Sequence, residues 1–147
     1  MLGANTKATV LVVEDERPVR DLLRLHLENA GYSVITAADA VIAGKVFIER
    51  IREIDLLVVD AHLPYMTGIE FVSTVIADTT LPPVPMILIT GHETLAVRAA
   101  VLDVPCLFKP FSAADLLSVV ARSLGSSGVP STARPKEPHD LRPLGAA

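Results

Sequence analysis

The sequence predicts an α/β fold in which helices cover both faces of a doubly wound parallel β-sheet. Two observations lead to this prediction. Five short apolar runs alternate with longer segments whose apolar residues recur at helical spacing. Four of the runs also end in polar residues, and the carboxyl ends of parallel strands meet at one edge of a sheet. The 147 residues are enough for one domain with its own core.

Strands and helices alternate from the start of the chain. Thr9 to Val13 is a continuous β-branched run, which is typical of a strand buried on both faces. Glu16 to Ala30 repeats apolar residues every three or four positions, and Gly31 then favours a helix C-terminus. Ser33 to Ala37 predicts the second strand. Asp39 to about Arg52 predicts the second helix, because its apolar residues recur on one face.

The second half of the chain continues the alternation, and a cluster of three prolines separates its first helix from the next strand. Its expected elements are strands at Leu56–Val59, Met86–Ile89 and Cys106–Phe108, and helices at Gly68–Ala77, Glu93–Leu102 and Ser112–Leu124. The helix at Glu93–Leu102 is short. Ser112 is expected to cap the last helix, since its hydroxyl can accept a first-turn N–H.

Composition divides the chain into three parts. Residues 1–7 form an N-terminal extension, and residues 8–124 form the folded domain. In residues 125–147 Gly, Ser and Pro dominate and apolar residues thin out, so this tail is expected to be disordered.

Charge and cysteine content exclude several classes of protein. A net charge of −4 with no basic run argues against nucleic-acid binding. No apolar run approaches the ~20 residues of a membrane span, and the first residues lack a signal-peptide pattern. Cys106 is the only cysteine, so no intrachain disulfide and no cysteine zinc cage can form. These features predict a cytoplasmic protein without membrane insertion.

The polar residues that follow four of the expected strands form one chemical set: Glu14, Asp15, Asp60, Thr90 and Lys109. Three carboxylates this close raise one another's pKa unless a cation neutralises them. Mg²⁺ suits a site with few carboxylates and a phosphate. A carboxylate such as Asp60 can also act as a nucleophile and form an acyl phosphate. The set therefore predicts a divalent-cation site that handles a phosphoryl group.

Each residue of this set also has a structural explanation. Glu14 and Asp15 would stabilise the N-terminus of the helix that follows them. Asp60 could be a turn residue and Thr90 a helix cap. Lys109 could be a solvated surface charge, the usual state of lysine.

With these motifs in order, the sequence resembles the receiver domain of two-component response regulators, of the single-domain type. The resemblance covers roughly Ala8 to Leu124. It rests on Glu14-Asp15, Asp60-Ala61-His62-Leu63-Pro64-Tyr65-Met66-Thr67-Gly68, Thr90-Gly91 and Lys109-Pro110-Phe111. Each motif alone is weakly specific, whereas all four in order are strongly specific. The resemblance implies a flavodoxin-like sheet of strand order 2-1-3-4-5.

The resemblance implies a phosphoacceptor that works with Mg²⁺. Asp60 would accept a phosphoryl group from a histidine on a partner kinase or phosphotransfer protein. Mg²⁺ would be bound by Asp15, by Asp60 and by the backbone carbonyl of His62, with Glu14 supporting through water.

Two further residues would contact the phosphoryl group in this family. Lys109 would neutralise its oxygens, and Thr90 would move to bond one of them. The Lys109-Pro110 peptide is expected to be cis, which would turn Lys109 inward.

The chain departs from the family pattern at two places. Cys106 stands three residues before Lys109, where the family usually has the Tyr or Phe that relays the movement of Thr90. Core packing is the favoured interpretation of this cysteine, ahead of redox sensing. The stretch from Thr90 to Lys109 is about three residues short, so the fourth helix should be shortened or reoriented, and the switch atypical. His62, two residues after Asp60, could be a metal ligand or a general base, but the favoured interpretation is a residue that controls water access to Asp60.

Three functions remain open from sequence. The first is a phosphorylatable signalling module without its own effector domain, which would act by binding partners or by relaying phosphate to another histidine. Its downstream partner is unknown, and pairing with a second copy is a further option. The second is a receiver-like interaction module that ignores phosphorylation. The third is an enzyme, which we disfavour: an aspartyl phosphatase would want a second carboxylate at the position of His62, and a nucleotide binder would want a glycine-rich loop after the first strand.

Overall fold

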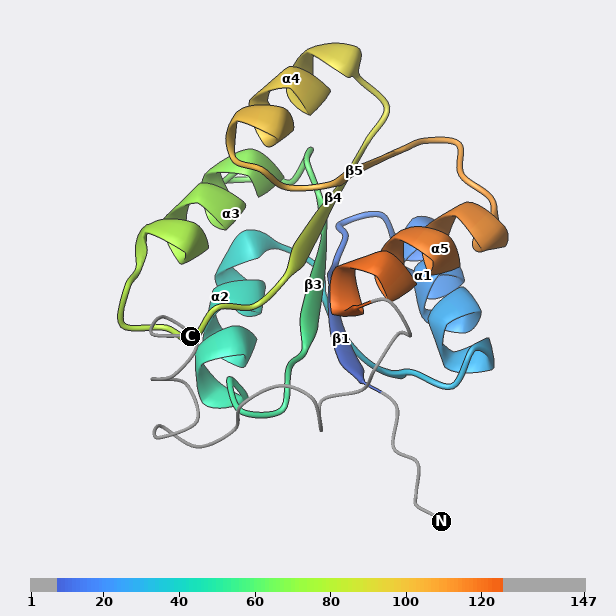
Figure 1. The fold of residues 1–147 in the computed structure, drawn as a ribbon, viewed down its shortest axis with the longest axis horizontal. Helices are drawn as coiled ribbons and strands as arrows, with labels where there is room; N and C mark the ends of the chain where they lie inside the picture. Colours follow the sequence, from blue (N-terminus) through green and yellow to red (C-terminus); the bar gives the residue numbers. More distant parts are fainter. Residues whose placement is uncertain (1–7, 126–147) are drawn as a thin grey trace.

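Five parallel strands form one sheet in the computed structural model, which describes residues 8–125 (Figure 1). The strands are β1 (Thr9–Val13), β2 (Ser33–Ala37), β3 (Leu56–Asp60), β4 (Met86–Thr90) and β5 (Cys106–Phe108). Their order is β2-β1-β3-β4-β5, and every neighbouring pair is parallel. The predicted fold class and strand order are therefore confirmed. The extension at residues 1–7 and all but the first residue of the expected tail lie outside the described residues.

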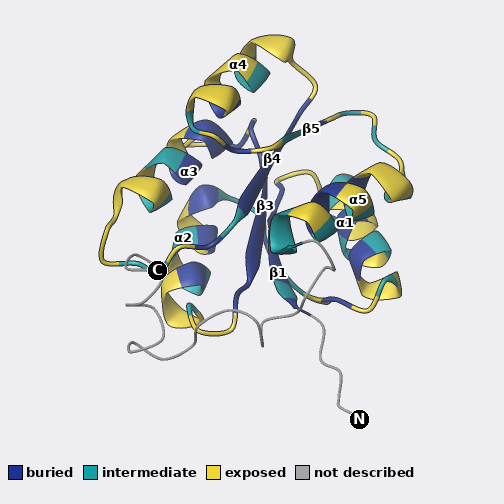
Figure 2. Ribbon diagram, viewed as in Figure 1, coloured by how far each residue is buried: buried dark blue, intermediate teal, exposed yellow. Residues whose placement is uncertain are grey.

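Helices cover the sheet on both sides, as expected. They are α1 (Arg17–Asn29), α2 (Ala40–Glu49), α3 (Gly68–Ala77), α4 (Glu93–Val101) and α5 (Ala113–Leu124). Figure 1 shows α2, α3 and α4 on one face and α1 and α5 on the other, and each face has its own apolar core. β3 and β4 are buried at every residue, which explains why their sequences are continuously apolar up to the last position (Figure 2).

Side chains at the helix ends set the limits of the helices. Thr67 and Ser112 each accept a hydrogen bond from the backbone N–H three residues on, which confirms Ser112 as an N-cap. The prediction that the second helix reaches about Arg52 is wrong, because α2 ends at Glu49. Arg50 leaves the helical conformation and pairs with Glu53, and the chain then turns to bury Ile54 ahead of β3.

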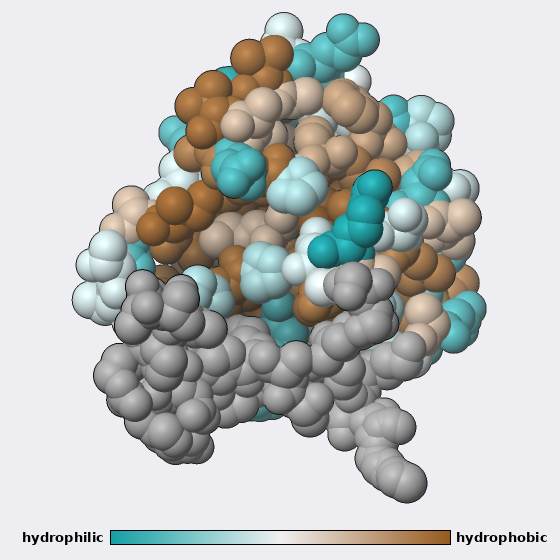
Figure 3. Space-filling model, viewed as in Figure 1, coloured by the Kyte–Doolittle hydropathy of each residue, from teal (hydrophilic) through white to brown (hydrophobic). Residues whose placement is uncertain are grey.

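The predicted shortening of the fourth helix is confirmed. With nine residues, α4 is the shortest of the five helices in residues 8–125. Its outer face exposes two apolar side chains one turn apart, Val97 (66% exposed) and Val101 (82% exposed). Apolar surface gathers over this helix in Figure 3. None of the helices in residues 8–125 has the length and apolar character of a transmembrane span.

Candidate functional site

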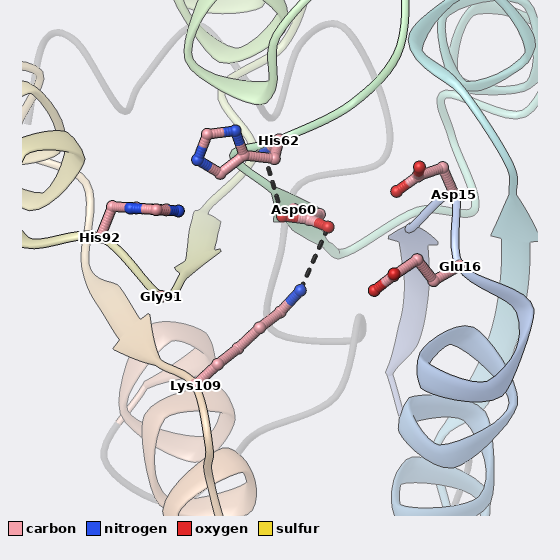
Figure 4. A pocket seen from close by; sticks show the side chains of 7 residues that line it. All are labelled: Asp15, Glu16, Asp60, His62, Gly91, His92 and Lys109. Carbon is pink, nitrogen blue, oxygen red and sulfur yellow. Dashed lines mark hydrogen bonds and ion pairs between the residues drawn. The ribbon is translucent and has the colours of Figure 1, made fainter.

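The carboxyl ends of four adjacent strands bring the predicted residues together. Asp60 and Thr90 are the last residues of β3 and β4, while Glu14 follows β1 and Lys109 follows β5. The Lys109 Nζ atom lies 3.3 Å from Asp60 Oδ2 and 3.5 Å from Glu14 Oε1. A pocket of about 320 Å³ opens beside this group. Figure 4 shows the side chains that line it: Asp15, Glu16, Asp60, His62, Gly91, His92 and Lys109.

Burial changes the acid–base behaviour of Glu14, the innermost carboxyl group of the site. Glu14 is fully buried and Asp60 is 3% exposed, whereas Asp15 is exposed. Loss of hydration raises the pKa of Glu14 to about 8, and the neighbouring Asp60 adds to this shift. Glu14 therefore holds a proton near neutral pH unless further positive charge compensates it.

Lys109 is the cation that partly compensates these acids. Its partial burial lowers the pKa of the ammonium group, but attraction to Asp60 and Glu14 outweighs burial and raises the pKa overall. Lys109 stays charged. The Lys109-Pro110 peptide is cis, as expected, and the side chain points at Asp60 (Figure 4).

The donor set fits a hard divalent cation such as Mg²⁺. Carboxylate oxygens of Glu14, Asp15 and Asp60 lie within 4.8 Å of one another. Glu14 Oε1 is buried without a hydrogen-bond partner, and the Lys109 ammonium at 3.5 Å is its ion-pair partner. Three carboxyl groups against one ammonium leave room for further positive charge, and the three clustered side chains all offer oxygen ligands.

The loop after β3 holds Asp60 through backbone contacts. The His62 N–H donates to Asp60 Oδ1 at 3.0 Å, which orients the carboxylate. Gly68, which begins α3, packs directly against the same strand end. A Cβ atom at Gly68 would lie 2.0 Å from the Asp60 carbonyl oxygen, so only glycine allows this approach.

Thr90 and Cys106 lie on neighbouring strands. Thr90 is 1% exposed, and its hydroxyl accepts a hydrogen bond from the His92 N–H at 3.0 Å. Cys106 is half-buried and packs against the core cluster beneath α2, α3 and α4. Burial raises the pKa of the Cys106 thiol, which leaves it uncharged at neutral pH.

Sequence analysis missed three residues at this site. Arg20, on α1, donates from Nη1 to the carbonyl oxygens of Glu14 at 2.9 Å and Asp15 at 3.3 Å. The side chains of Glu16 and His92 line the pocket. His92 follows the end of β4 by two residues, as His62 follows the end of β3, and this matching spacing was the available signal.

The chain belongs to the response regulator receiver domain family. The family model matches residues 10–121, which include the four strand ends of the site. Receiver domains of two-component systems are phosphoacceptors and are generally not classed as enzymes.

Similar proteins support this assignment. The phosphate regulon transcriptional regulatory protein PhoB of Pseudomonas aeruginosa is 31% identical over 134 residues, which are 88% of this chain and 57% of that protein. The response regulator MprA of Mycobacterium leprae is 35% identical over 112 residues, 74% of this chain and 47% of that protein. The chain thus spans about half the length of these curated relatives.

Solved structures agree in fold. The chemotaxis response regulator CheY4 of Vibrio cholerae has 31% identity and a TM-score of 0.72, with 81% of this chain and 100% of that chain covered. A response regulator receiver domain protein of Clostridium thermocellum has 27% identity and a TM-score of 0.74, with coverage of 81% and 95%.

Proposed function

We propose that this protein is a phosphoacceptor of a two-component phosphorelay and that Asp60 receives the phosphoryl group. The donor is a phosphohistidine on a histidine kinase or a histidine phosphotransfer protein. The contact that supports this most is the one between Lys109 Nζ and Asp60 Oδ2 at 3.3 Å. It holds a cation where the phosphoryl oxygens would arrive, next to a carboxylate at the end of a buried strand.

In the proposed transfer, a carboxylate oxygen of Asp60 forms a bond to phosphorus as the phosphorus–nitrogen bond of the donor breaks. The donor imidazole keeps the electron pair and is reprotonated. Lys109 neutralises the phosphoryl oxygens, and the His62 N–H holds the Asp60 carboxylate in position. The protein's part is therefore positioning and charge stabilisation, which is what phosphoryl transfer demands.

We propose that Mg²⁺ is bound by Asp15, Asp60 and the backbone carbonyl of His62, with Glu14 acting through water. Bound there, Mg²⁺ would supply positive charge to offset that of the phosphoryl oxygens. The buried Glu14 Oε1 atom, which accepts no hydrogen bond, and the clustered carboxylates support this assignment. Arg20 fixes the backbone of Glu14 and Asp15, so it is a positioning residue for the same site.

We propose that output runs through protein–protein contacts, with Thr90 and Cys106 as the switch. The Thr90 hydroxyl would leave the His92 N–H to bond a phosphoryl oxygen. Cys106 is too small to repeat the rotation of the aromatic residue that the family usually has here. The way in which phosphorylation changes the outer surface would therefore differ from the family pattern. At most slow self-dephosphorylation, pairing of two copies and a cytoplasmic location are further parts of this proposal.

The decisive experiment is phosphorylation with Mg²⁺ and a small phosphodonor, read by intact mass. The wild-type chain should gain one phosphoryl group, and Asp60→Asn should gain none. Asp39→Asn is the matched control, because Asp39 is the N-cap of α2 and asparagine caps equally well. An unmodified wild-type chain would contradict the proposal. Partner binding unchanged by Asp60→Asn would then favour the phosphorylation-independent interaction module, and repeated turnover of phosphate esters would favour an enzyme.

A further inference from the structure

His62 and His92 form a pair of exposed imidazoles at the pocket that the proposed phosphorylation chemistry does not use. His62 belongs to the loop after β3, and His92 is the residue immediately before α4. The ring centroids are 4.6 Å apart, with an interplanar angle of 65°. In Figure 4 both rings stand on one side of Asp60, opposite Asp15 and Glu16.

We propose that these two imidazoles form a second metal site, for a transition-metal ion of the Zn²⁺ class, distinct from the carboxylate cluster. A zinc–nitrogen bond of about 2.0–2.1 Å places the ion roughly 3 Å from the ring centre. Two imidazoles on one tetrahedral ion therefore have centres roughly 5 Å apart. The 4.6 Å separation of His62 and His92 is close to this value.

Ligand chemistry separates the two sites. Imidazole nitrogens favour Zn²⁺, Cu²⁺ or Ni²⁺, whereas clustered carboxylates favour Mg²⁺. Asp15, Glu16 and Asp60 line the same pocket as the histidines and attract cations to it. Within residues 8–125 the only group of three metal-ligating side chains is the carboxylate cluster. An ion on the two histidines would therefore keep water in its remaining positions.

An ion at this site has a structural consequence. It would tie the loop that carries the His62 N–H contact to the start of α4, and it would stand beside Asp60 where a phosphodonor must approach. Bound Zn²⁺ should therefore slow phosphorylation of Asp60. This consequence, unlike the metal site itself, rests on the proposed function.

The test is calorimetric titration of Zn²⁺ into the full chain with saturating Mg²⁺ present. One Zn²⁺ should bind per chain, and the affinity should fall more than tenfold in His92→Gln and in His62→Gln. His92 makes no side-chain cap contact, so its replacement leaves the start of α4 intact. His26→Gln is the control, because His26 lies in the last turn of α1 and does not line the pocket. Asp15→Asn should still bind Zn²⁺ through the histidines.

Three results would overturn the metal site. Unchanged Zn²⁺ affinity in His92→Gln would place the ion on the carboxylates, and loss of Zn²⁺ binding in Asp15→Asn would do the same. Absence of Zn²⁺ binding would reduce the pair to an edge-to-face ring contact. The second measurement is the rate of Asp60 phosphorylation with and without Zn²⁺. The rate of each variant with Zn²⁺ is compared with its own rate without Zn²⁺. Zn²⁺ binding in a chain that takes up no phosphoryl group would uphold the metal site while contradicting the proposed function.

Discussion

At the scale of a single residue, the clearest electrostatic effect of the fold is on the pKa of Glu14. In an unfolded chain its carboxyl group has a pKa of about 4.5, whereas burial, with the adjacent Asp60, raises this pKa to about 8 in the folded protein. Between these two values the folded state holds a proton that the unfolded state has lost. Folding stability contributed by this group is therefore present at acid pH and is lost as pH rises toward 8.

We predict that the metal-free protein becomes less stable between pH 5 and pH 8 and that Glu14→Gln weakens this trend. The slope from one such group is at most about 1.4 kcal/mol per pH unit. Urea unfolding at several pH values, with a chelator present to keep the protein metal-free, measures this slope. Taking the difference between wild type and Glu14→Gln cancels the contribution of the histidines, which both proteins share. Parallel stability curves for the two proteins would show that Glu14 ionises normally.

Two glycines make a matched test at the scale of the helix. Gly44 lies within α2, where an added Cβ would meet Phe71 at an ordinary 3.9 Å, whereas Gly68 begins α3 against the backbone of Asp60. Gly44→Ala should stabilise the protein by about 0.5–1 kcal/mol through helix propensity. Gly68→Ala should destabilise it by about 1–3 kcal/mol, because the strand end must move.

Denaturation midpoints of the two alanine variants decide this prediction, and the phosphorylation assay adds a second reading. Displacement of the loop after β3 should lower the phosphorylation rate of Gly68→Ala but leave that of Gly44→Ala unchanged. Equal midpoints for both variants would mean that the close approach of Gly68 to Asp60 is not a constraint on the fold.

Element positions were predictable where hydrophobic pattern and capping agreed. The limits of β1, β2 and α3 match the sequence prediction, and Ser112 caps α5 as expected. The end of α2 was misplaced because Ile51 continues the helical pattern, while the backbone turns earlier so that Ile54 can enter the core. Periodicity reports which residues face the core, but it does not report where the chain must turn to reach the next strand.

At the scale of the whole molecule, the fold class made part of the site predictable. Residues that end buried strands must share one sheet edge in a parallel fold, which brought Asp60 and Lys109 together correctly. Arg20 and His92 were not predicted. Arg20 acts on backbone carbonyls, and His92 contacts His62 through the relative placement of two loops. The Arg20 contact leaves no pattern in the sequence. The one sequence signal for His92 was its spacing from the end of β4, which matches that of His62 from the end of β3.

A metal site built from distant parts of the chain links binding to global stability. Asp15 and Asp60 are brought together only by the pairing of β1 with β3, so the unfolded chain has no preformed site. Mg²⁺ should therefore bind the folded state selectively and stabilise it by about 2.7 kcal/mol at a free concentration one hundred times its Kd. Urea unfolding at increasing Mg²⁺ measures this rise.

The Mg²⁺-dependent rise should disappear in Asp15→Asn and persist in Asp21→Asn. Asp21 is an exposed acid on α1 that pairs only with Arg17 among the described ion pairs, so its removal changes the overall charge equally but leaves the site intact. A nonspecific effect of ionic strength would act on both variants alike. If Asp15→Asn gained as much stability from Mg²⁺ as Asp21→Asn, the cation would be binding elsewhere on the acidic surface. If only Asp21→Asn gains, the strand ends of β1 and β3 hold the ion.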